Sequence, residues 1–225
     1  MAITESQHPQ VDSAEDETYL YHHFEDLQQQ HETSSLGMWA FLATEVLFFG
    51  GVFAAFAYYQ SIFPEAFKEA SHHLNIPLGA FNTAILLCSS LTMALAVRAS
   101  QLRQRKQTVW FLLGTIALGS VFLGIKFYEW SIEYRDGLVP GLNFDFSQVE
   151  HRQEVIFWSL YFTATGLHAI HMIIGIAIIA IMAVLVWRRW MTGTGSTQVE
   201  MLGLYWHLVD IVWVFLFPVL YLINH

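Results

Sequence analysis

Charged residues and cysteine are both scarce in this sequence, and each scarcity excludes a class of protein. Only 13% of the 225 residues are charged, about half the share in a typical soluble domain. Lys and Arg number 10 against 19 acidic residues, and the net charge of −9 argues against binding to nucleic acid, which requires a basic patch. The single cysteine, Cys88, excludes an internal disulfide bond and any zinc or iron–sulfur site with several cysteine ligands.

Apolar residues dominate instead. They make up 55% of the chain, and the mean hydropathy is +0.42. They gather in five stretches, and a helix needs about 20 mostly apolar residues to cross the hydrocarbon core of a bilayer. We therefore predict an all-α membrane protein, a bundle of five transmembrane helices with a polar N-terminal extension. The predicted helices are residues 34–60, 78–97, 108–130, 155–187 and 201–223.

The first 32 residues differ in composition from the rest of the chain. They contain eight acidic residues and neither Lys nor Arg. They also lack the basic start and the apolar run of a secretory signal peptide. We therefore divide the chain into a polar, acidic, cytoplasmic extension (1–32), with a short helix expected at 19–30, and a five-helix membrane domain (33–225).

The positions of Lys and Arg predict the orientation in the membrane. The positive-inside rule places the more basic loops in the cytoplasm. The loops after the second and fourth predicted helices contain six basic residues, and the opposite loops contain three. The N-terminus is then cytoplasmic, and the C-terminus lies outside. The six are Arg98, Arg103, Arg105, Lys106, Arg188 and Arg189, and the three are Lys68, Arg135 and Arg152.

Glu45 lies close to the middle of the first predicted helix, where a charged group is expensive. We expect it to be a protonated acid at neutral pH. One interpretation is a neutral carboxylic acid that hydrogen-bonds to a neighbouring helix. The other is a group that exchanges protons or contacts lipid.

His168 and His171 lie three residues apart in the fourth predicted helix and share one face. A haem or metal site would need a further ligand from another helix, and His207 in the fifth predicted helix is available. Paired histidines do not recur on a second helix, as a two-haem site would require. We therefore favour neutral imidazoles that hydrogen-bond between helices.

His207 lies one turn before Asp210, so the two could share a proton or a charge. With the aromatic stripe of Trp206 and Trp213, the pair could form a proton relay. The alternative, which we favour, is a polar clamp that joins two helices.

Three further features lie near helix ends or on helix surfaces. Lys126 and Glu129 lie three residues apart, and long side chains at a helix end can reach the headgroups. We therefore expect these two residues to contact lipid or a loop at the interface. We expect the same lipid contacts of the basic pair after the fourth predicted helix, Arg188 and Arg189. Ser120 and Gly124 form a pair of small residues that permits close helix approach.

Five strings of residues resemble subunit III of the haem–copper oxidases, specifically the bacterial cytochrome c oxidase type. The strings in the fourth and fifth predicted helices are the most specific. The strings are Thr-Glu-Val-Leu-Phe-Phe (44–49), Asn-Thr-Ala-Ile-Leu-Leu (82–87), Phe-Tyr-Glu-Trp (127–130), Gly-Leu-His-Ala-Ile-His-Met-Ile-Ile-Gly (166–175) and Tyr-Trp-His-Leu-Val-Asp-Ile-Val-Trp (205–213).

The resemblance implies a subunit that binds no redox centre and has neither catalytic residues nor metal ligands. In the family, haem and copper lie in subunit I, and a dicopper site lies in subunit II. Subunit III packs against subunit I, binds structural phospholipid and helps to keep proton uptake and turnover intact. Glu45 matches the acid that reacts with hydrophobic carbodiimides, and His168 and His171 match the paired histidines.

The resemblance also implies a place and a set of partners. The place is the plasma membrane of a bacterium. The partners are subunits I and II of a complex that takes part in aerobic respiration. This complex can join a larger respiratory supercomplex. The sequence lacks two N-terminal helices of the mitochondrial form and in this respect resembles the shorter bacterial form. The lipid-filled cleft that those helices help to enclose must here be open or filled by another subunit.

Several alternatives remain open. Within the family, the chain could belong to a quinol oxidase or accompany a nitric oxide reductase, because the site for the electron donor lies on a partner. A proton-coupled transporter that uses Glu45 and Asp210 is an alternative outside the family. The sequence shows neither the inverted repeat nor the broken half-helices that are typical of transporters. A haem-binding membrane cytochrome is a third class.

Overall fold

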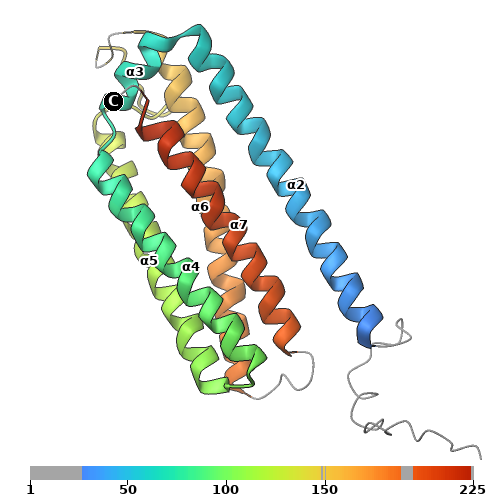
Figure 1. Cartoon of the computed structure of the whole chain (residues 1–225). Coiled ribbons are helices and arrows are strands. Elements are labelled where there is room, and N and C mark those ends of the chain that lie inside the picture. The colour runs from blue at the N-terminus through green and yellow to red at the C-terminus, as the bar shows by residue number, and fades with distance from the viewer. Residues whose placement is uncertain (1–26, 148, 150, 189–194, 224–225) are drawn as a thin grey trace, which may run out of the picture.

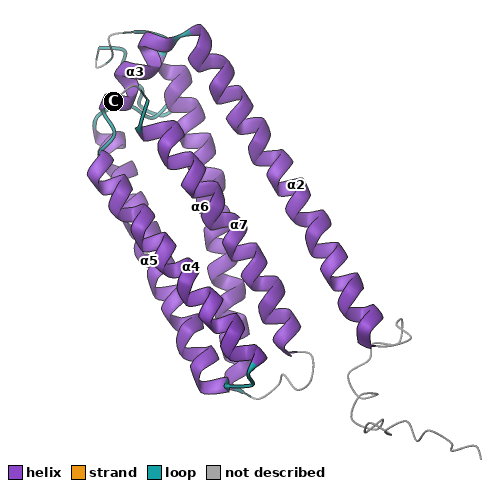
Figure 2. Cartoon of the chain, viewed as in Figure 1, coloured by secondary structure: helices purple, strands orange, loops and turns teal. Residues whose placement is uncertain are grey.

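The computed structural model describes residues 27–147, 149, 151–188 and 195–223, and these ranges contain helices and loops but no strand (Figures 1 and 2). Five of the helices within them, all except α3, are long and apolar enough to cross a membrane. The protein is therefore an all-helical, multi-pass membrane protein, as predicted. The described helices are α2 (Leu27–Ile62), α3 (Pro64–His72), α4 (Ile76–Gln101), α5 (Arg105–Arg135), α6 (Glu154–Trp187) and α7 (Gly195–Tyr221).

The long helices run up and down, so that successive long helices are antiparallel (Figure 1). We call the end that holds the α4–α5 connection the inner end, and the end that holds α3 the outer end. The helices α4, α5, α6 and α7 form the main bundle, and α2 packs beside α6 and α7. Among the described side chains of α2, the buried apolar ones are Leu42, Phe49 and Phe56, which are spaced seven apart on one narrow stripe.

Most of the helices extend beyond their predicted ends. The helix predicted at 108–130 begins at Arg105 and continues to Arg135, and α4 begins at Ile76, after Asn75, whose side chain caps it. The helix α2 begins inside the predicted extension, and residues 1–26, including most of the helix expected at 19–30, lie outside the described residues. A pattern of apolar residues marks the hydrocarbon core alone, whereas a helix can continue through the polar headgroup region.

The short helix α3 lies in the segment 61–77, which we expected to be an outer loop. Phe67 of α3 is fully buried, and its ring packs edge-on against Phe56 of α2 at 5.1 Å and Phe157 of α6 at 5.5 Å between centroids. The helix therefore covers the outer end of the bundle. Its buried residues share one face and are Ala66, Phe67, Ala70 and Ser71.

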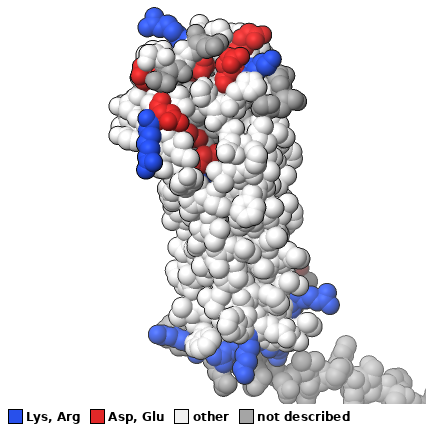
Figure 3. Space-filling model, turned by 90° about the vertical axis from the view of Figure 1, so that its left-hand side faces the viewer, with Lys and Arg blue, Asp and Glu red and all other residues white. Residues whose placement is uncertain are grey.

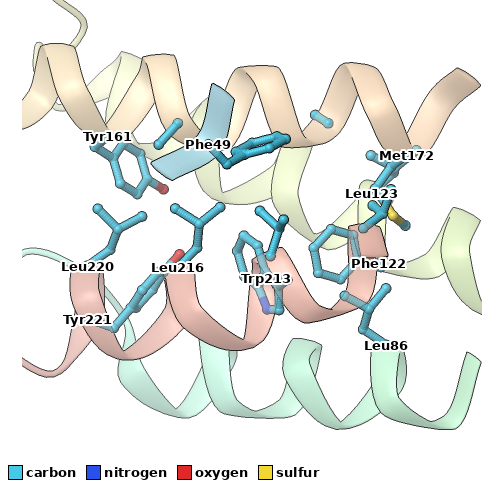
Figure 4. Packing of buried hydrophobic residues seen from close by; sticks show 14 of the residues in the cluster. Phe49, Leu86, Phe122, Leu123, Tyr161, Met172, Trp213, Leu216, Leu220 and Tyr221 are labelled. Carbon is cyan, nitrogen blue, oxygen red and sulfur yellow. The ribbon is translucent and has the colours of Figure 1, made fainter. Parts of the chain in front are cut away.

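Large aromatic side chains fill the core between the helices (Figure 4). Trp206 and Trp213 of α7 are both fully buried, and Trp213 lies edge-on to Phe122 of α5, with 4.8 Å between ring centroids. Close approach of α5 and α6 to Trp206 requires glycine. A Cβ atom on Gly119 would lie 2.9 Å from this indole, and one on Gly175 would lie 3.0 Å from it.

Charged residues gather at the two ends of the molecule, and the middle of the face in Figure 3 is almost free of them. Basic residues dominate the end near the α4–α5 connection, whereas the α3 end also carries acidic residues (Figure 3). A belt of uncharged surface between two charged ends is the pattern expected of a protein that spans a bilayer.

Candidate functional site: polar residues inside the bundle

Glu45, near the middle of α2, and His171 form a polar contact between α2 and α6. Glu45 Oε2 lies 3.0 Å from His171 Nε2, and the two side chains are 18% and 17% exposed. The ring of Phe49 packs edge-on against His171, with 5.2 Å between centroids. Of the two interpretations of Glu45, this contact matches the hydrogen bond to a neighbouring helix.

The hydrogen bonds of His171 limit which of the two groups can donate in this contact. His171 Nδ1 lies 2.8 Å from the carbonyl oxygen of Leu167 and must carry a proton, because a carbonyl oxygen only accepts. A neutral imidazole then accepts at Nε2 from a protonated Glu45, and an imidazolium donates to a carboxylate. Either arrangement ties α2 to α6.

His168 has a different environment from His171, although both lie in α6. Its ring is buried between Phe122 of α5 and Trp213 of α7, with centroid distances of 5.6 Å and 5.2 Å. Neither ring nitrogen has a hydrogen-bond partner among the described residues. The expected hydrogen bond between helices was therefore wrong for His168, because its side of α6 faces the aromatic core.

His207 and Asp210 do not form the expected pair. His207 Nδ1 lies 2.8 Å from Ser90 Oγ, so this histidine joins α7 to α4. Asp210 is buried, and neither of its carboxylate oxygens makes a hydrogen bond within the described part of the chain. A polar contact does join two helices here, as expected. The partner of His207 in it is Ser90 rather than Asp210.

Two tryptophan side chains add to the contact between α4 and α7. Trp206 Nε1 donates to Ser89 Oγ at 3.1 Å, and Trp213 Nε1 donates to Thr83 Oγ1 at 3.0 Å. The aromatic stripe of α7 therefore contributes hydrogen bonds as well as apolar surface, because indole N–H groups usually find a partner when they are buried.

A group of five bonded polar side chains lies near the outer end, and we call it the outer polar cluster. It joins α5, α6 and α7. Lys126 Nζ lies 2.8 Å from Glu129 Oε2, 3.1 Å from Tyr161 Oη and 2.9 Å from Tyr221 Oη. Tyr221 donates to Glu129 at 2.6 Å, and Tyr161 donates to Glu133 at 2.6 Å. Its members are Lys126, Glu129, Glu133, Tyr161 and Tyr221.

The lipid or loop contacts expected for Lys126 and Glu129 were wrong. Lys126 is 2% exposed and Glu129 is 5% exposed. Because α5 continues to Arg135, Lys126 lies about two and a half turns inside the helix. The spacing of Phe122, Lys126, Glu129 and Glu133 (four, three and four residues) puts all of them on the core side of α5.

Sequence reasoning missed Glu133, Tyr161 and Tyr221. The helical spacing from Phe122 was a usable signal for Glu133. No pattern in the sequence marks the two tyrosines, because their partners lie on other helices.

The basic residues at the inner end bind helix termini or face outward. Arg105 donates from Nε to the carbonyl oxygen of Val186 at 2.9 Å and from Nη2 to that of Trp187, which joins the start of α5 to the end of α6. Arg188 is exposed, and Arg189 lies outside the described residues. The lipid contacts of this pair stay a prediction.

Metal ligation would require several suitable side chains to converge. Within the described ranges, no group of three or more His, Cys, Asp or Glu residues is arranged to hold a metal ion. His168 and His171 contact different helices, and His207 contacts Ser90. His171 and His207 instead join pairs of helices.

Comparison with known proteins relates this arrangement to one family. The family model described as "Cytochrome c oxidase subunit III" matches residues 3–225. A relative named "Probable quinol oxidase subunit 3" from Staphylococcus aureus (strain USA300) is 29% identical over 193 residues, which are 86% of this chain and 90% of the relative. A protein of the same name from Staphylococcus haemolyticus (strain JCSC1435) is 28% identical over an equally long match that covers the same shares of both chains.

The family match covers all five long helices, and with them Glu45, His168, His171, His207 and Asp210. It confirms the resemblance found in the sequence. The chain belongs to the cytochrome c oxidase subunit III family, whose members associate with subunits I and II of haem–copper oxidases.

Proposed function

We propose that this chain is a non-catalytic membrane subunit of a proton-pumping terminal oxidase that receives electrons from cytochrome c. In this role it packs against subunit I, neighbours subunit II, binds structural phospholipid, and supports proton uptake and sustained turnover. Haem and copper belong to the partner subunits, and the whole complex can join a larger respiratory assembly. The family match over residues 3–225 carries the proposal.

The contacts of the polar side chains support a structural role for the chain in such a complex. The contact of Glu45 with His171 joins α2 to α6, and the contact of Ser90 with His207 joins α4 to α7. Both contacts lie between side chains of different helices, as expected of residues that hold a bundle together.

The exposed surface of α2 supports the proposed contact with a partner. Large apolar side chains such as Leu36, Val46 and Leu47 are 72%, 58% and 76% exposed. In a membrane these faces contact lipid tails or a neighbouring protein helix. We propose that subunit I and structural phospholipid share this surface.

The proposed function includes the orientation in the membrane that the sequence predicts. The N-terminus and the basic inner end lie in the cytoplasm of a bacterium, and the C-terminus lies outside the plasma membrane. The concentration of Lys and Arg at one end of the molecule (Figure 3) supports this orientation under the positive-inside rule.

The names of the relatives favour a second candidate function. The proteins from both Staphylococcus species are named as probable quinol oxidase subunits. A quinol oxidase built in the same way would use this chain in the same structural role, with a quinol in place of cytochrome c as electron donor.

Purification of the complex tests the role and separates the two candidates. An affinity tag before Met1 should copurify a haem-containing subunit I and a subunit II, identified by mass spectrometry. The isolated chain should lack stoichiometric iron and copper and should show no Soret absorption. Either metal in the isolated chain at one equivalent, or copurification with no oxidase, would contradict the proposal.

The electron donor is then read from the same preparation. A dicopper subunit II, together with oxidation of reduced cytochrome c, supports the first candidate. Oxidation of a quinol without oxidation of cytochrome c supports the second.

A further inference from the structure

The outer polar cluster contains five titratable side chains with no part in the proposed function. All five are at most 5% exposed, and together they join three helices. The hydroxyl groups of Tyr161 and Tyr221 point into the space between α6 and α7 (Figure 4). Such a group of buried ionisable residues must balance its charges internally, because water is not available to screen them.

The donors and acceptors of the cluster fix the direction of every hydrogen bond in it. Lys126 Nζ has three neighbours, Glu129 Oε2, Tyr161 Oη and Tyr221 Oη, and an ammonium group has three protons and no acceptor. The two tyrosine oxygens therefore accept from Lys126. Each tyrosine then donates its own proton to a carboxylate oxygen, Tyr221 to Glu129 Oε1 and Tyr161 to Glu133 Oε1.

This pattern distinguishes the two glutamates. Glu129 accepts a hydrogen bond on each oxygen, so it is a carboxylate that balances the charge of Lys126. Glu133 accepts on Oε1 only, and its Oε2 is buried without a partner in the described structure. An ionised Glu133 would place a second negative charge beside a single cation and leave one charged oxygen without a donor, which is unfavourable in a buried site.

We propose that the outer polar cluster binds one additional proton, held on Oε2 of Glu133. Four ionisable groups act on this carboxyl. Lys126 and Glu129 belong to α5, Asp136 is the C-terminal cap of α5, and Tyr161 belongs to α6. Asp136 is exposed and lies one turn beyond Glu133. The bound proton makes the whole cluster neutral.

Infrared spectroscopy of the full chain in lipid nanodiscs tests whether the proton is bound. The spectrum of the wild-type protein minus that of Glu133→Gln should contain the carbonyl stretch of one protonated carboxyl group. This band should move to lower frequency in D2O. The exposed variant Asp136→Asn is the matched control and should leave the band unchanged. If the difference spectrum contains only carboxylate bands, Glu133 is ionised and the proposal is wrong.

Two tyrosine variants test where the proton is held. Tyr161→Phe removes the donor to Glu133 Oε1 and should raise the frequency of the carbonyl band. Tyr221→Phe removes the donor to Glu129 and should leave the frequency unchanged. Both variants keep the buried aromatic ring. The opposite result, with a shift in Tyr221→Phe alone, would place the proton on Glu129 and overturn the assignment.

Discussion

Identical residue types take different roles in this bundle, according to the side of the helix on which they lie. His171 faces α2 and contacts Glu45, whereas His168, three residues earlier, faces the aromatic rings of the core. Three residues correspond to about 300° of helical rotation, so the two rings point about 60° apart. This separation is enough for one ring to meet a carboxyl group and the other to meet only apolar surface.

We predict opposite effects for the removal of these two histidines. His168→Leu replaces an imidazole without hydrogen bonds, so stability should stay unchanged or rise by about 1 kcal/mol. His171→Leu leaves Glu45 without its partner and should cost about 1–3 kcal/mol. Thermal unfolding of both variants in the same detergent measures the difference. A loss of stability for His168→Leu as large as that for His171→Leu would contradict the assigned environments.

The neutral variant Glu45→Gln should preserve the contact with His171, because an amide can donate or accept at the same place. Redox chemistry belongs to a partner subunit in the proposed function, so the first turnovers of oxygen consumption should stay within about twofold of wild type. Glu45→Lys instead places an amine opposite His171 and should lower the yield of assembled complex. Oxygen consumption and proton release in vesicles, followed over many turnovers, provide the measurement. Failure of Glu45→Gln already in its first turnovers would make Glu45 part of the obligatory chemistry.

The helix α5 shows how one element can have two different faces. One face carries Phe122, Lys126, Glu129 and Glu133, all of which are buried. The opposite face carries residues such as Gly124, around which a Cβ atom would meet nothing within 4 Å. The close helix approach that we expected at Ser120 and Gly124 is instead made by Gly119, against the indole of Trp206.

Two alanine variants of α5 should therefore differ sharply. Gly119→Ala forces a methyl group against Trp206, which is fully buried and hydrogen-bonded to Ser89 and so cannot easily move. Such overpacking typically costs about 1–3 kcal/mol. Gly124→Ala meets open space and should be neutral or gain up to about 1 kcal/mol of helix propensity. Unfolding temperatures of the two variants give the comparison, and equal values would show that the indole can relax.

The molecule as a whole is asymmetric along the membrane normal. Its inner end carries most of the Lys and Arg residues, and its outer end holds α3, the outer polar cluster and several exposed acidic residues (Figure 3). The two ends therefore present different charges to the two sides of the membrane.

Labelling of single cysteines tests the orientation. In a protein without Cys88, a cysteine at Gln104 should react only with reagent supplied on the cytoplasmic side, because the proposed orientation places the segments 98–107 and 188–200 inside. A cysteine at Leu142, which is 78% exposed, should react only from outside, like the rest of segments 61–77 and 131–154. Labelling of position 104 from outside would reverse the orientation.

The sequence by itself determined the fold class, the number of membrane helices and the family. Long apolar runs are sufficient for this, because a bilayer offers no water to satisfy the backbone, and a chain that crosses it forms helices or a closed barrel. The same runs could not show α3, whose amphipathic pattern covers only nine residues, or the full length of α5.

The partner of each polar side chain was decided by the tertiary structure alone. The sequence singled out Lys126 and Glu129, but their burial depends on the rotation of α5 and on tyrosines from two helices that are distant in the chain. It paired His207 with Asp210 on one helix, whereas the packing of α7 against α4 offered Ser90 instead. Hydropathy along a chain reports how apolar a segment is, but the direction of each side chain is set only when the helices pack together.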